Sequence, residues 1–458
     1  MAAVSPIASG GEARPGIGGR LAQLALCALL CLSITLPVIN FSESLPWFKI
    51  EQLALPLIAV VYLWFLLAGF ARPFRANGMI AIAVLYAFCV ALALFYGWVS
   101  LGHTVLLRDF YEIPKVFLPA AFFTLGLEAG LTETSLLRLL KWLSLAMLLV
   151  CVYAWAQWMD LGFTHFLANF YSGGSHDEGS LSHYRRVYST MGNPNLLAQL
   201  LTWAIAAFAL AAFFGLGSRW RSLLMMFACL VTLVMTGSRY GVLNTVLALV
   251  LVFALRLRSN RSESRLPLVL ALIPILIWIA LAVAGHNQAT MERLETLRDP
   301  LAADSFRVRA DRLWKDAGDE FLLSPLFGHG PAKDIFSGIV TDSEYLDVLK
   351  QFGLVGFSVY LLYFVFPLRK LWKGVRLAGR LNADVEADQQ GRLWALRLSL
   401  VMVVTALAMN VGMSTFYNPP LQGFLWMWLG IGAASAKSLQ QAEARLDAFR
   451  LRQPGPPL

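Results

Sequence analysis

The stretch DSFRVRADRLWKDAGDEFLLSPLFGHGPAKDIFSGIVTDSEYLDVLKQFGLVG, residues 304–356, is a long polar insertion in a chain otherwise dominated by apolar runs. Its first part has apolar residues at helical spacing and predicts an amphipathic helix over residues 306–322. A turn-rich segment over residues 325–331 follows. An acidic, tyrosine-bearing segment over residues 341–346 then runs directly into the next apolar run. We expect the chemistry of the protein in this insertion, at one mouth of a bundle of helices.

The composition assigns the remainder of the chain to a membrane. Hydrophobic residues make up 58% and charged residues 14% of the 458 residues, whereas a soluble protein carries about 25% charged residues. Apolar runs of roughly 17–22 residues recur, and each is long enough to cross a bilayer as a helix. A membrane barrel would instead need alternating segments of about ten residues. The sequence therefore predicts an all-α, polytopic membrane protein.

The apolar runs predict about twelve transmembrane helices in two blocks. About nine spans lie in residues 21–284 and the last three lie in residues 351–436, with a large loop over residues 285–350 between the blocks. A smaller loop is expected near residues 159–194. The spans are predicted near residues 21–39, 52–71, 78–99, 114–128, 137–158, 195–215, 221–236, 240–256, 266–284, 351–368, 395–412 and 419–436.

The distribution of Lys and Arg predicts the orientation of the bundle. If the two tails, residues 1–20 and 437–458, are cytoplasmic, the inside segments hold 23 of the 37 Lys and Arg residues and the short outside loops hold six. Cytoplasmic loops of membrane proteins carry the excess of basic residues, whereas long loops cross the membrane regardless of their charge. The count therefore predicts a multi-pass protein with both termini cytoplasmic and with loop 285–350 on the outer side.

The net charge of +9 does not indicate a nucleic-acid partner. The excess of basic residues lies in short loops, where it sets the topology, and we expect no nucleic acid to bind. The sequence has no His-x-x-x-His or Asp-x-Asp pattern, and its five cysteines lie in apolar spans without metal-ligand spacing. We therefore expect no metal and no cofactor.

Arginines close to the outer surface are candidates for anion binding. Residues 236–241, Thr-Gly-Ser-Arg-Tyr-Gly, join two predicted spans almost without a loop. Arg239 in this turn is either an interfacial side chain that extends to water or part of an anion site, because a guanidinium binds two phosphate oxygens at once and glycine N–H groups add donors. Arg309 and Arg312, beside Trp314 on the same side, form either a solvated helix face or the second half of that site.

Three residues of the insertion are candidates for acid–base chemistry. His329 lies in a tight Gly-His-Gly turn, although most loop histidines have no catalytic role. Asp342 and Glu344 stand directly before a span. Each of these acids is either a general base for a hydroxyl group or a side chain that complements the helix dipole.

Several short motifs follow one another in a defined order along the outer side. These are Gly-Asn-Pro-Asn at 192–195, Thr-Gly-Ser-Arg at 236–239, Arg309 with Trp314, Pro-Leu-Phe-Gly-His-Gly at 325–330, Tyr345-Leu346 and Gly-Leu-Val-Gly at 353–356. Asn193 is expected to cap the span that follows it. The ordered set resembles the O-antigen ligase and O-antigen polymerase superfamily, over about residues 190–360.

This resemblance implies a bacterial inner-membrane glycosyltransferase of the GT-C type that works without metal on the periplasmic face. The implied donor is a glycan on undecaprenyl pyrophosphate. The implied acceptor is a glycan, a lipid A-core or a protein, in the assembly of lipopolysaccharide, exopolysaccharide or a related surface polysaccharide. The lipid bilayer is the remaining partner.

The resemblance also implies roles for individual residues. Arg239 and an arginine of the loop helix, Arg309 before Arg312, would bind the pyrophosphate. Asn193, Asn195, Trp314 and Tyr345 would shape or line the site.

One departure from the family pattern concerns the base. Ligases of this family carry a His-Asn pair where this chain has Asp342-Ser343. The base would then be Asp342 or His329, with Glu344 as a further candidate. An acid at this point favours a polymerase of repeat units over a ligase.

The main alternative is a transporter or flippase that moves a polysaccharide or lipid-linked glycan without catalysis. Twelve spans suit such a protein. However, transporter sites lie near the membrane midplane on broken helices with buried charges, and the predicted spans contain few charged residues.

Overall fold

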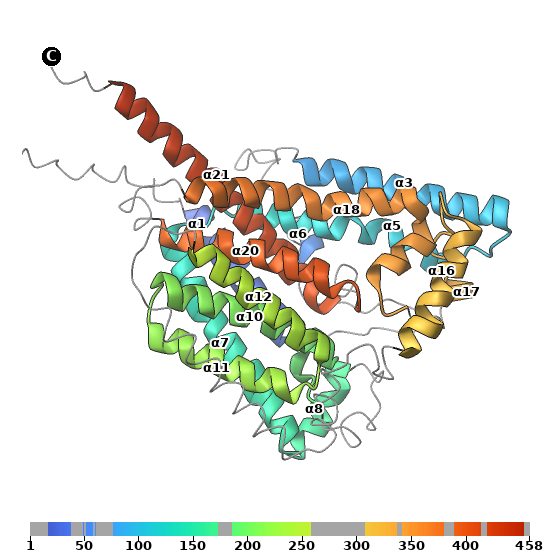
Figure 1. The fold of residues 1–458 in the computed structure, drawn as a ribbon, viewed down its shortest axis with the longest axis horizontal. Coiled ribbons are helices and arrows are strands. Elements are labelled where there is room, and N and C mark those ends of the chain that lie inside the picture. The colour runs from blue at the N-terminus through green and yellow to red at the C-terminus, as the bar shows by residue number, and fades with distance from the viewer. Residues whose placement is uncertain are drawn as a thin grey trace, which may run out of the picture.

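The fold was analysed in a computed structural model that describes residues 17–37, 49, 52–57, 60, 77–172, 186–257, 307–336, 341–379, 389–413 and 419–452. Every regular element in these ranges is a helix (Figure 1). The predicted all-α fold class is therefore confirmed for the described part of the chain.

The helices run along the chain with short connections. Their bounds are α1 Ile17–Thr35, α3 Gly78–Leu101, α4 Leu107–Phe110, α5 Glu112–Lys115, α6 Phe117–Glu128, α7 Glu133–Trp158, α8 Phe163–Ser172, η1 Ser189–Met191, α10 Pro194–Phe214, α11 Arg219–Met235, α12 Arg239–Leu257, η2 Arg309–Leu313, α16 Trp314–Leu323, α17 Lys333–Phe336, α18 Glu344–Ala378, α20 Gln390–Met409 and α21 Pro419–Arg452.

Seven helical stretches in the described part are long and apolar enough to cross a membrane. They are Gly78–Leu101, Leu107–Glu128, Glu133–Trp158, Pro194–Phe214, Arg239–Leu257, Glu344–Ala378 and Gln390–Met409. Helices α1, α11 and α21 coincide with further predicted spans. The span predicted near residues 266–284, and most of that near 52–71, lie outside the described residues, so the number twelve stays a prediction.

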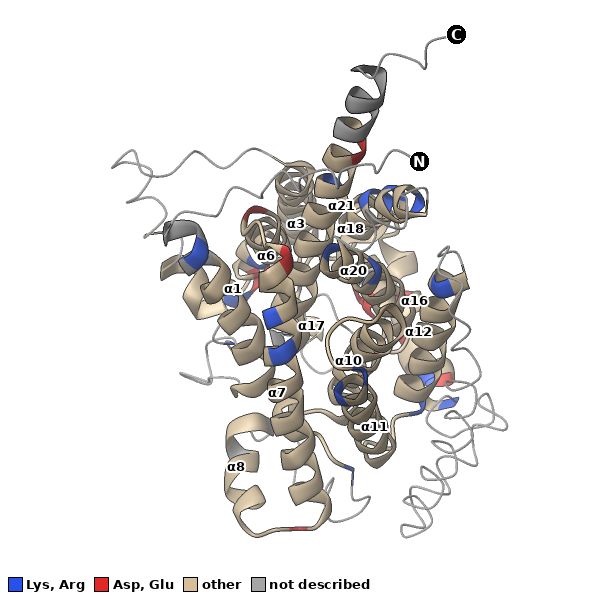
Figure 2. Cartoon of the chain, turned by 90° about the vertical axis from the view of Figure 1, so that its left-hand side faces the viewer, with Lys and Arg blue, Asp and Glu red and all other residues tan. Residues whose placement is uncertain are grey.

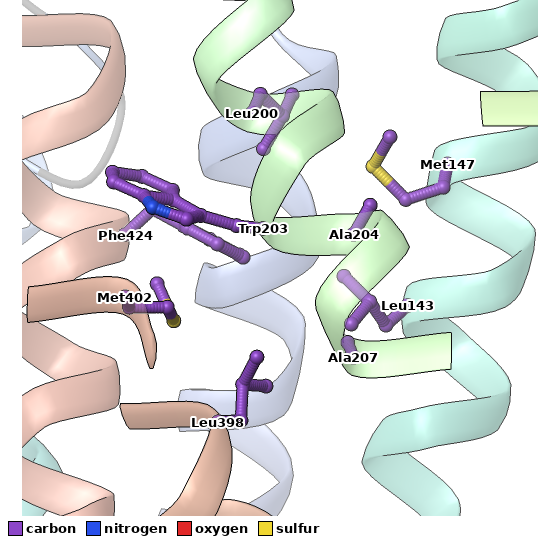
Figure 3. Close-up of a pocket in the computed structure, with 9 residues that line it drawn as sticks. All are labelled: Leu143, Met147, Leu200, Trp203, Ala204, Ala207, Leu398, Met402 and Phe424. Atoms are coloured by element: carbon purple, nitrogen blue, oxygen red, sulfur yellow. The ribbon is translucent and has the colours of Figure 1, made fainter. Parts of the chain in front are cut away.

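The centre of the bundle is α10. It packs against α11, α12 and α20, and nearly all of its side chains are buried. Trp203 of α10 stacks on Phe424 of α21 with ring centroids 6.1 Å apart, and its indole N–H donates to Thr405 Oγ1 at 3.0 Å. The void beside this pair, lined by the apolar side chains in Figure 3, has a volume of only about 10 Å³. A space of this size holds one water at most, so this part of the interior is closed by packing.

Helix α18 is broken near its start, at Gly353. The residue has φ 61° and ψ −169°, a conformation that glycine adopts far more readily than other residues. A break removes intrahelical partners from backbone groups, and no water replaces them in a membrane. The freed groups must therefore find partners elsewhere in the protein.

The turn over residues 325–330 supplies those partners. The N–H groups of Leu354 and Val355 donate to the carbonyl oxygens of Pro325 and Leu326, at 2.8 and 3.1 Å. In return, the carbonyl oxygens of Lys350 and Gln351 accept from the N–H groups of His329 and Gly330, at 3.0 and 2.8 Å. We call this set of backbone hydrogen bonds the α18 junction. It docks the polar insertion onto the bundle.

Glycines make the close approach at the α18 junction possible. A Cβ atom on Gly353 would clash with the carbonyl oxygen of Leu326, and one on Gly328 would clash with the carbonyl oxygen of Gln351. Gly328 also has a positive φ of 72°. The Gly-His-Gly and Gly-Leu-Val-Gly motifs of the sequence are thus the two sides of one contact.

The bundle has two distinct ends. The end of the bundle that carries α16 and α17, at the right in Figure 1, holds the last residues of α3 and α20 and the first residues of α18. We call it the loop end. Figure 2 views the molecule from the opposite end and shows Lys and Arg residues on α1, α7, α18, α20 and α21.

We expect Gly353→Ala to lower the thermal unfolding midpoint of the purified protein by several degrees. The added methyl group meets backbone atoms at a positive φ, and overpacking of this kind costs about 1–3 kcal/mol. The matched control is Gly318→Ala in α16, where a Cβ meets no atom within 4 Å and alanine favours the helix by about 1 kcal/mol. Equal midpoints for the two variants would contradict the assigned role of the α18 junction.

Candidate functional site

The candidate site lies at the loop end, where η2, the turn before α12 and the start of α18 meet. Arg309 of η2 is at its centre. Its Nε atom donates to Asp342 Oδ2 at 3.1 Å, and its guanidinium carbon lies 5.5 Å from the ring centroid of Tyr240. The side chain of Arg309 is 15% exposed and that of Asp342 is 38% exposed. Arg309, a candidate anion-binding residue, and Asp342, a candidate general base, thus form an ion pair that remains accessible to a ligand.

Arg239 directly precedes Tyr240, whose ring the Arg309 guanidinium covers. It is the first residue of α12 and it is half-buried. Gly412, which follows α20, packs closely against the hydroxyl end of the Tyr240 ring. A Cβ atom on Gly412 would lie only 2.6 Å from the Tyr240 Cζ atom. Arg309 therefore contacts the start of α12 through Tyr240, the residue after Arg239.

The turn that carries Arg239 is held by its own polar side chains. Gly237 adopts φ 58°, the Ser238 N–H donates to Thr236 Oγ1 at 3.2 Å, and the Gly241 N–H donates to Ser238 Oγ at 3.2 Å. Ser238 Oγ in turn donates to Asn195 Oδ1 at 2.9 Å. Asn195 of α10 thereby fixes the turn from outside.

Arg186 completes this scaffold and was not among the predicted site residues. Its Nε atom donates to the carbonyl oxygen of Thr236 at 2.8 Å, and its Nη2 atom donates to Asn195 Oδ1 at 3.1 Å. The aliphatic part of its side chain packs against Gly237. The only sequence signal was its position in the outer loop, six residues before the Gly-Asn-Pro-Asn motif.

Asn193 caps α10 as predicted. Its side-chain oxygen accepts from the Asn195 N–H at 2.8 Å, and Pro194 occupies the first turn of the helix, where proline loses no intrahelical hydrogen bond. The cap orients Asn195 toward the Arg239 turn. Both asparagines therefore serve the site from the start of α10.

The predicted acids have different surroundings. Asp342 has a positive φ of 51° and precedes Ser343, the N-cap residue of α18. The Glu344 side chain is fully buried, and its N–H donates to the carbonyl oxygen of Asn410 at 3.0 Å. Asp342 is thus the acid within reach of a substrate, whereas Glu344 lies inside the contact between α18 and the end of α20.

His329 lies away from this pair, in the α18 junction. Its side chain is 5% exposed, its Nδ1 atom is 3.0 Å from His103 Nε2, and its Nε2 atom is 2.8 Å from the carbonyl oxygen of Glu320. Both ring nitrogens are therefore engaged by protein atoms. The ring links the insertion to the segment that follows α3.

The remaining predicted residues surround the site at different depths. The Tyr345 hydroxyl donates to the carbonyl oxygen of Leu407 at 2.6 Å, which ties α18 to α20. Trp314 begins α16 and is half-buried, whereas Arg312 is exposed. Arg309 is therefore the more enclosed of the two loop arginines.

The helix predicted over residues 306–322 is present, with one difference. Residues Arg309–Leu313 form a π-helical turn before α16, and residue 306 lies outside the described residues. Wide turns of this kind are frequent at functional sites. Here the π-helical turn begins at Arg309, the residue that contacts Asp342.

We expect Asn195→Ala to increase hydrogen–deuterium exchange of the amides in residues 236–241. The substitution removes the acceptor shared by Ser238 and Arg186, and lost side-chain hydrogen bonds of this kind free the turn to open. The control is Ser218→Ala, which removes the cap at the other end of α11. If both variants exchanged at the wild-type rate in residues 236–241, Asn195 would not hold the turn.

Comparison with known protein families identifies this region. Residues 224–361, from within α11 to within α18, match the family model described as O-antigen ligase. The match confirms the resemblance to the O-antigen ligase and polymerase superfamily, and it indicates membrane glycosyltransferase activity of the O-antigen ligase type in polysaccharide assembly. No curated protein matches the chain.

Proposed function

We propose that the protein uses its O-antigen ligase domain to transfer a glycan from undecaprenyl pyrophosphate to an acceptor hydroxyl. The observation that carries the proposal is the ion pair of Arg309 with the accessible Asp342 at the loop end, beside the Tyr240 ring that directly follows Arg239 in the chain. With Arg239 as a second cation, this arrangement suits a reaction in which a pyrophosphate leaves and a hydroxyl loses its proton.

The arginines suit the binding of a pyrophosphate. Arg309 is largely enclosed and stacks on Tyr240, so its charge is less screened than that of an exposed arginine. Arg239 is adjacent to Tyr240 in the chain. Arg186 directs its guanidinium to Thr236 and Asn195, and we assign it the role of positioning the Arg239 turn. The exposed Arg312 is a weaker candidate.

Asp342 is the proposed general base. In the proposed reaction, the acceptor oxygen attacks C1 of the donor sugar, and a C1–O glycosidic bond forms as the bond between C1 and the pyrophosphate oxygen breaks. Asp342 takes the hydroxyl proton, and undecaprenyl pyrophosphate leaves with the electron pair of the broken bond. The guanidinium groups stabilise its negative charge.

The ion pair of Arg309 with Asp342 would make donor binding precede proton transfer to Asp342. The Arg309 Nε–H donates to Asp342 Oδ2, so this carboxylate oxygen is already engaged when an acceptor hydroxyl arrives. An arriving pyrophosphate competes for Arg309 and so releases Asp342. The base would then become active only when the donor is bound. His329 and Glu344, both enclosed by protein atoms, are assigned structural roles.

The membrane orientation and the type of transfer are part of the same proposal. We place the loop end on the periplasmic face of a bacterial inner membrane, with both termini cytoplasmic, because the short loops predicted at the opposite end carry the excess of Lys and Arg residues. We favour a metal-independent polymerase of repeat units over a ligase, because Asp342-Ser343 stands where ligases of the family carry His-Asn.

The first experiment measures release of undecaprenyl pyrophosphate by the purified protein. The substrate is a synthetic undecaprenyl-pyrophosphate oligosaccharide, and EDTA is present throughout. A ladder of longer lipid-linked glycans would identify a polymerase, and transfer only to an added lipid A-core or protein would identify a ligase. No release with any acceptor, together with movement of the donor across liposomes, would favour a transporter.

We expect Arg309→Ala to reduce donor turnover by on the order of 100-fold, the usual effect of removing one group that stabilises charge in a transition state. Arg239→Ala should have a similar effect. Arg312→Ala is the matched control, because it removes the same charge from an exposed position of η2, and it should change turnover less than about threefold. Turnover by Arg309→Ala at the level of Arg312→Ala would refute the assignment.

We expect Asp342→Asn to lower kcat by at least about 100-fold, within the range for loss of a general base. Donor binding should be retained or tightened, because the amide no longer competes for Arg309. Asp316→Asn, at an exposed position of α16, is the control and should leave both constants unchanged. A variant with weakened donor binding and normal kcat would mean that Asp342 binds substrate instead.

A further inference from the structure

A second concave site lies at the opposite end of the bundle, between α3 and α18. It is a groove of about 290 Å³. Ile82 of α3, with Val365 and Phe366 of α18, forms an apolar part, and Arg369, Lys370 and Lys373 of α18 form a basic part. None of these residues belongs to the site described above.

The order of the lining residues along α18 separates the two parts by depth. Val365 and Phe366 precede Arg369, Lys370 and Lys373 by one to two turns on the same helix face, because spacings of three and four residues return to one side of a helix. The apolar part therefore lies closer to the middle of α18, and the basic part lies closer to its C-terminal end. An amphiphile with an apolar tail and an anionic head would fit both parts at once.

The basic part carries positive charge that the described residues do not neutralise. Among the ion pairs of the described part, none uses Arg369, Lys370 or Lys373. Lys437 of α21 lies close enough to Lys370 to interact with it electrostatically. Helix α3 supplies no Lys, Arg, Asp or Glu. Like charges gathered in one groove favour an anionic ligand.

A contact between Lys370 and Phe366 distinguishes the groove from a row of lysines that extend into water at the membrane surface. The Lys370 Nζ atom lies 4.3 Å from the ring centroid of Phe366, so this cation sits over the apolar part. A side chain that only extended toward water would leave this ring. The ammonium group and the ring instead form the boundary between the two parts of the groove.

We propose that this groove binds an anionic glycerophospholipid, with its phosphate on Arg369, Lys370 and Lys373 and an acyl chain along Ile82, Val365 and Phe366. Basic pockets between transmembrane helices on the cytoplasmic side bind such head groups. The assignment to the cytoplasmic leaflet rests on the orientation proposed above, whereas the binding itself does not. The lipid would hold α3 against the end of α18 opposite to Asp342.

Binding is tested by native mass spectrometry of the detergent-purified full chain with phosphatidylglycerol and with phosphatidylcholine of the same acyl chains. We expect phosphatidylglycerol to bind the wild type more tightly. The triple variant Arg369→Gln/Lys370→Gln/Lys373→Gln should lose on the order of 100-fold in apparent affinity, at about fivefold for each charge near an anionic head group.

Two controls distinguish lipid binding in the groove from non-specific electrostatic attraction of anionic lipid to the protein. Arg20→Gln/Arg138→Gln/Lys141→Gln removes as many exposed charges from α1 and α7 and should change affinity less than twofold. Ile82→Trp fills the groove and keeps every charge, so it should also abolish binding, whereas Val84→Trp at an exposed position of α3 should not. Thermal unfolding confirms that each variant is folded.

The proposal is overturned if Ile82→Trp binds phosphatidylglycerol like the wild type, if the control triple variant loses as much affinity, or if phosphatidylcholine binds equally well. None of these readouts depends on glycan transfer. A protein that binds the lipid but releases no undecaprenyl pyrophosphate would keep this inference and refute the proposed function.

Discussion

Backbone hydrogen bonds between the turn at residues 325–330 and the break in α18 at Gly353 are the constraint on which the loop end depends. A helix broken inside a bilayer is unstable unless its freed N–H and C=O groups find partners. The turn provides them from both sides of the break. In doing so, it determines where the insertion sits on the bundle. The helix before the turn and the start of α18 after it carry two parts of the candidate site, and both are connected to this junction.

The site is a consequence of that docking. Arg309 belongs to the segment before the turn, Asp342 to the segment after it, and their ion pair spans 33 residues of sequence. The Arg239 turn meets them from the bundle, where Asn195 and Arg186 hold it through side-chain hydrogen bonds. Hydrogen bonds thus hold Arg309 and the Arg239 turn before a donor binds, which reduces the reorganisation needed when a charged donor arrives. Asp342 keeps Arg309 oriented while no donor occupies the site.

Much of this arrangement could be predicted from the sequence. Long apolar runs reveal helices because a bilayer requires about 20 such residues per span. The motifs around Arg239, Arg309 and Asp342 were expected on one side of the membrane, and the contacts of Arg309 with Asp342 and Tyr240 join these motifs. The cap at Asn193 also followed from local rules.

Other features depend on tertiary contacts that no local pattern encodes. The break at Gly353 is stable only because a turn more than 20 residues earlier satisfies its backbone groups. The burial of Glu344 follows from the docking of α18 on α20. The pairing of His329 with His103 joins residues 226 positions apart. Nothing in the local sequence distinguishes Arg186 from other loop arginines, because its role depends on its contacts with Thr236 and Asn195.

The most direct test of the account is a structure of the protein with an unreactive phosphonate analogue of a lipid-linked glycan donor. The account predicts that the pyrophosphate mimic lies within about 3 Å of the guanidinium groups of Arg239 and Arg309. Arg309 should then have left Asp342, whose carboxylate should lie where it can accept the proton of a hydroxyl that attacks the donor C1. A donor bound elsewhere, with the ion pair of Arg309 and Asp342 intact, would contradict the central claim.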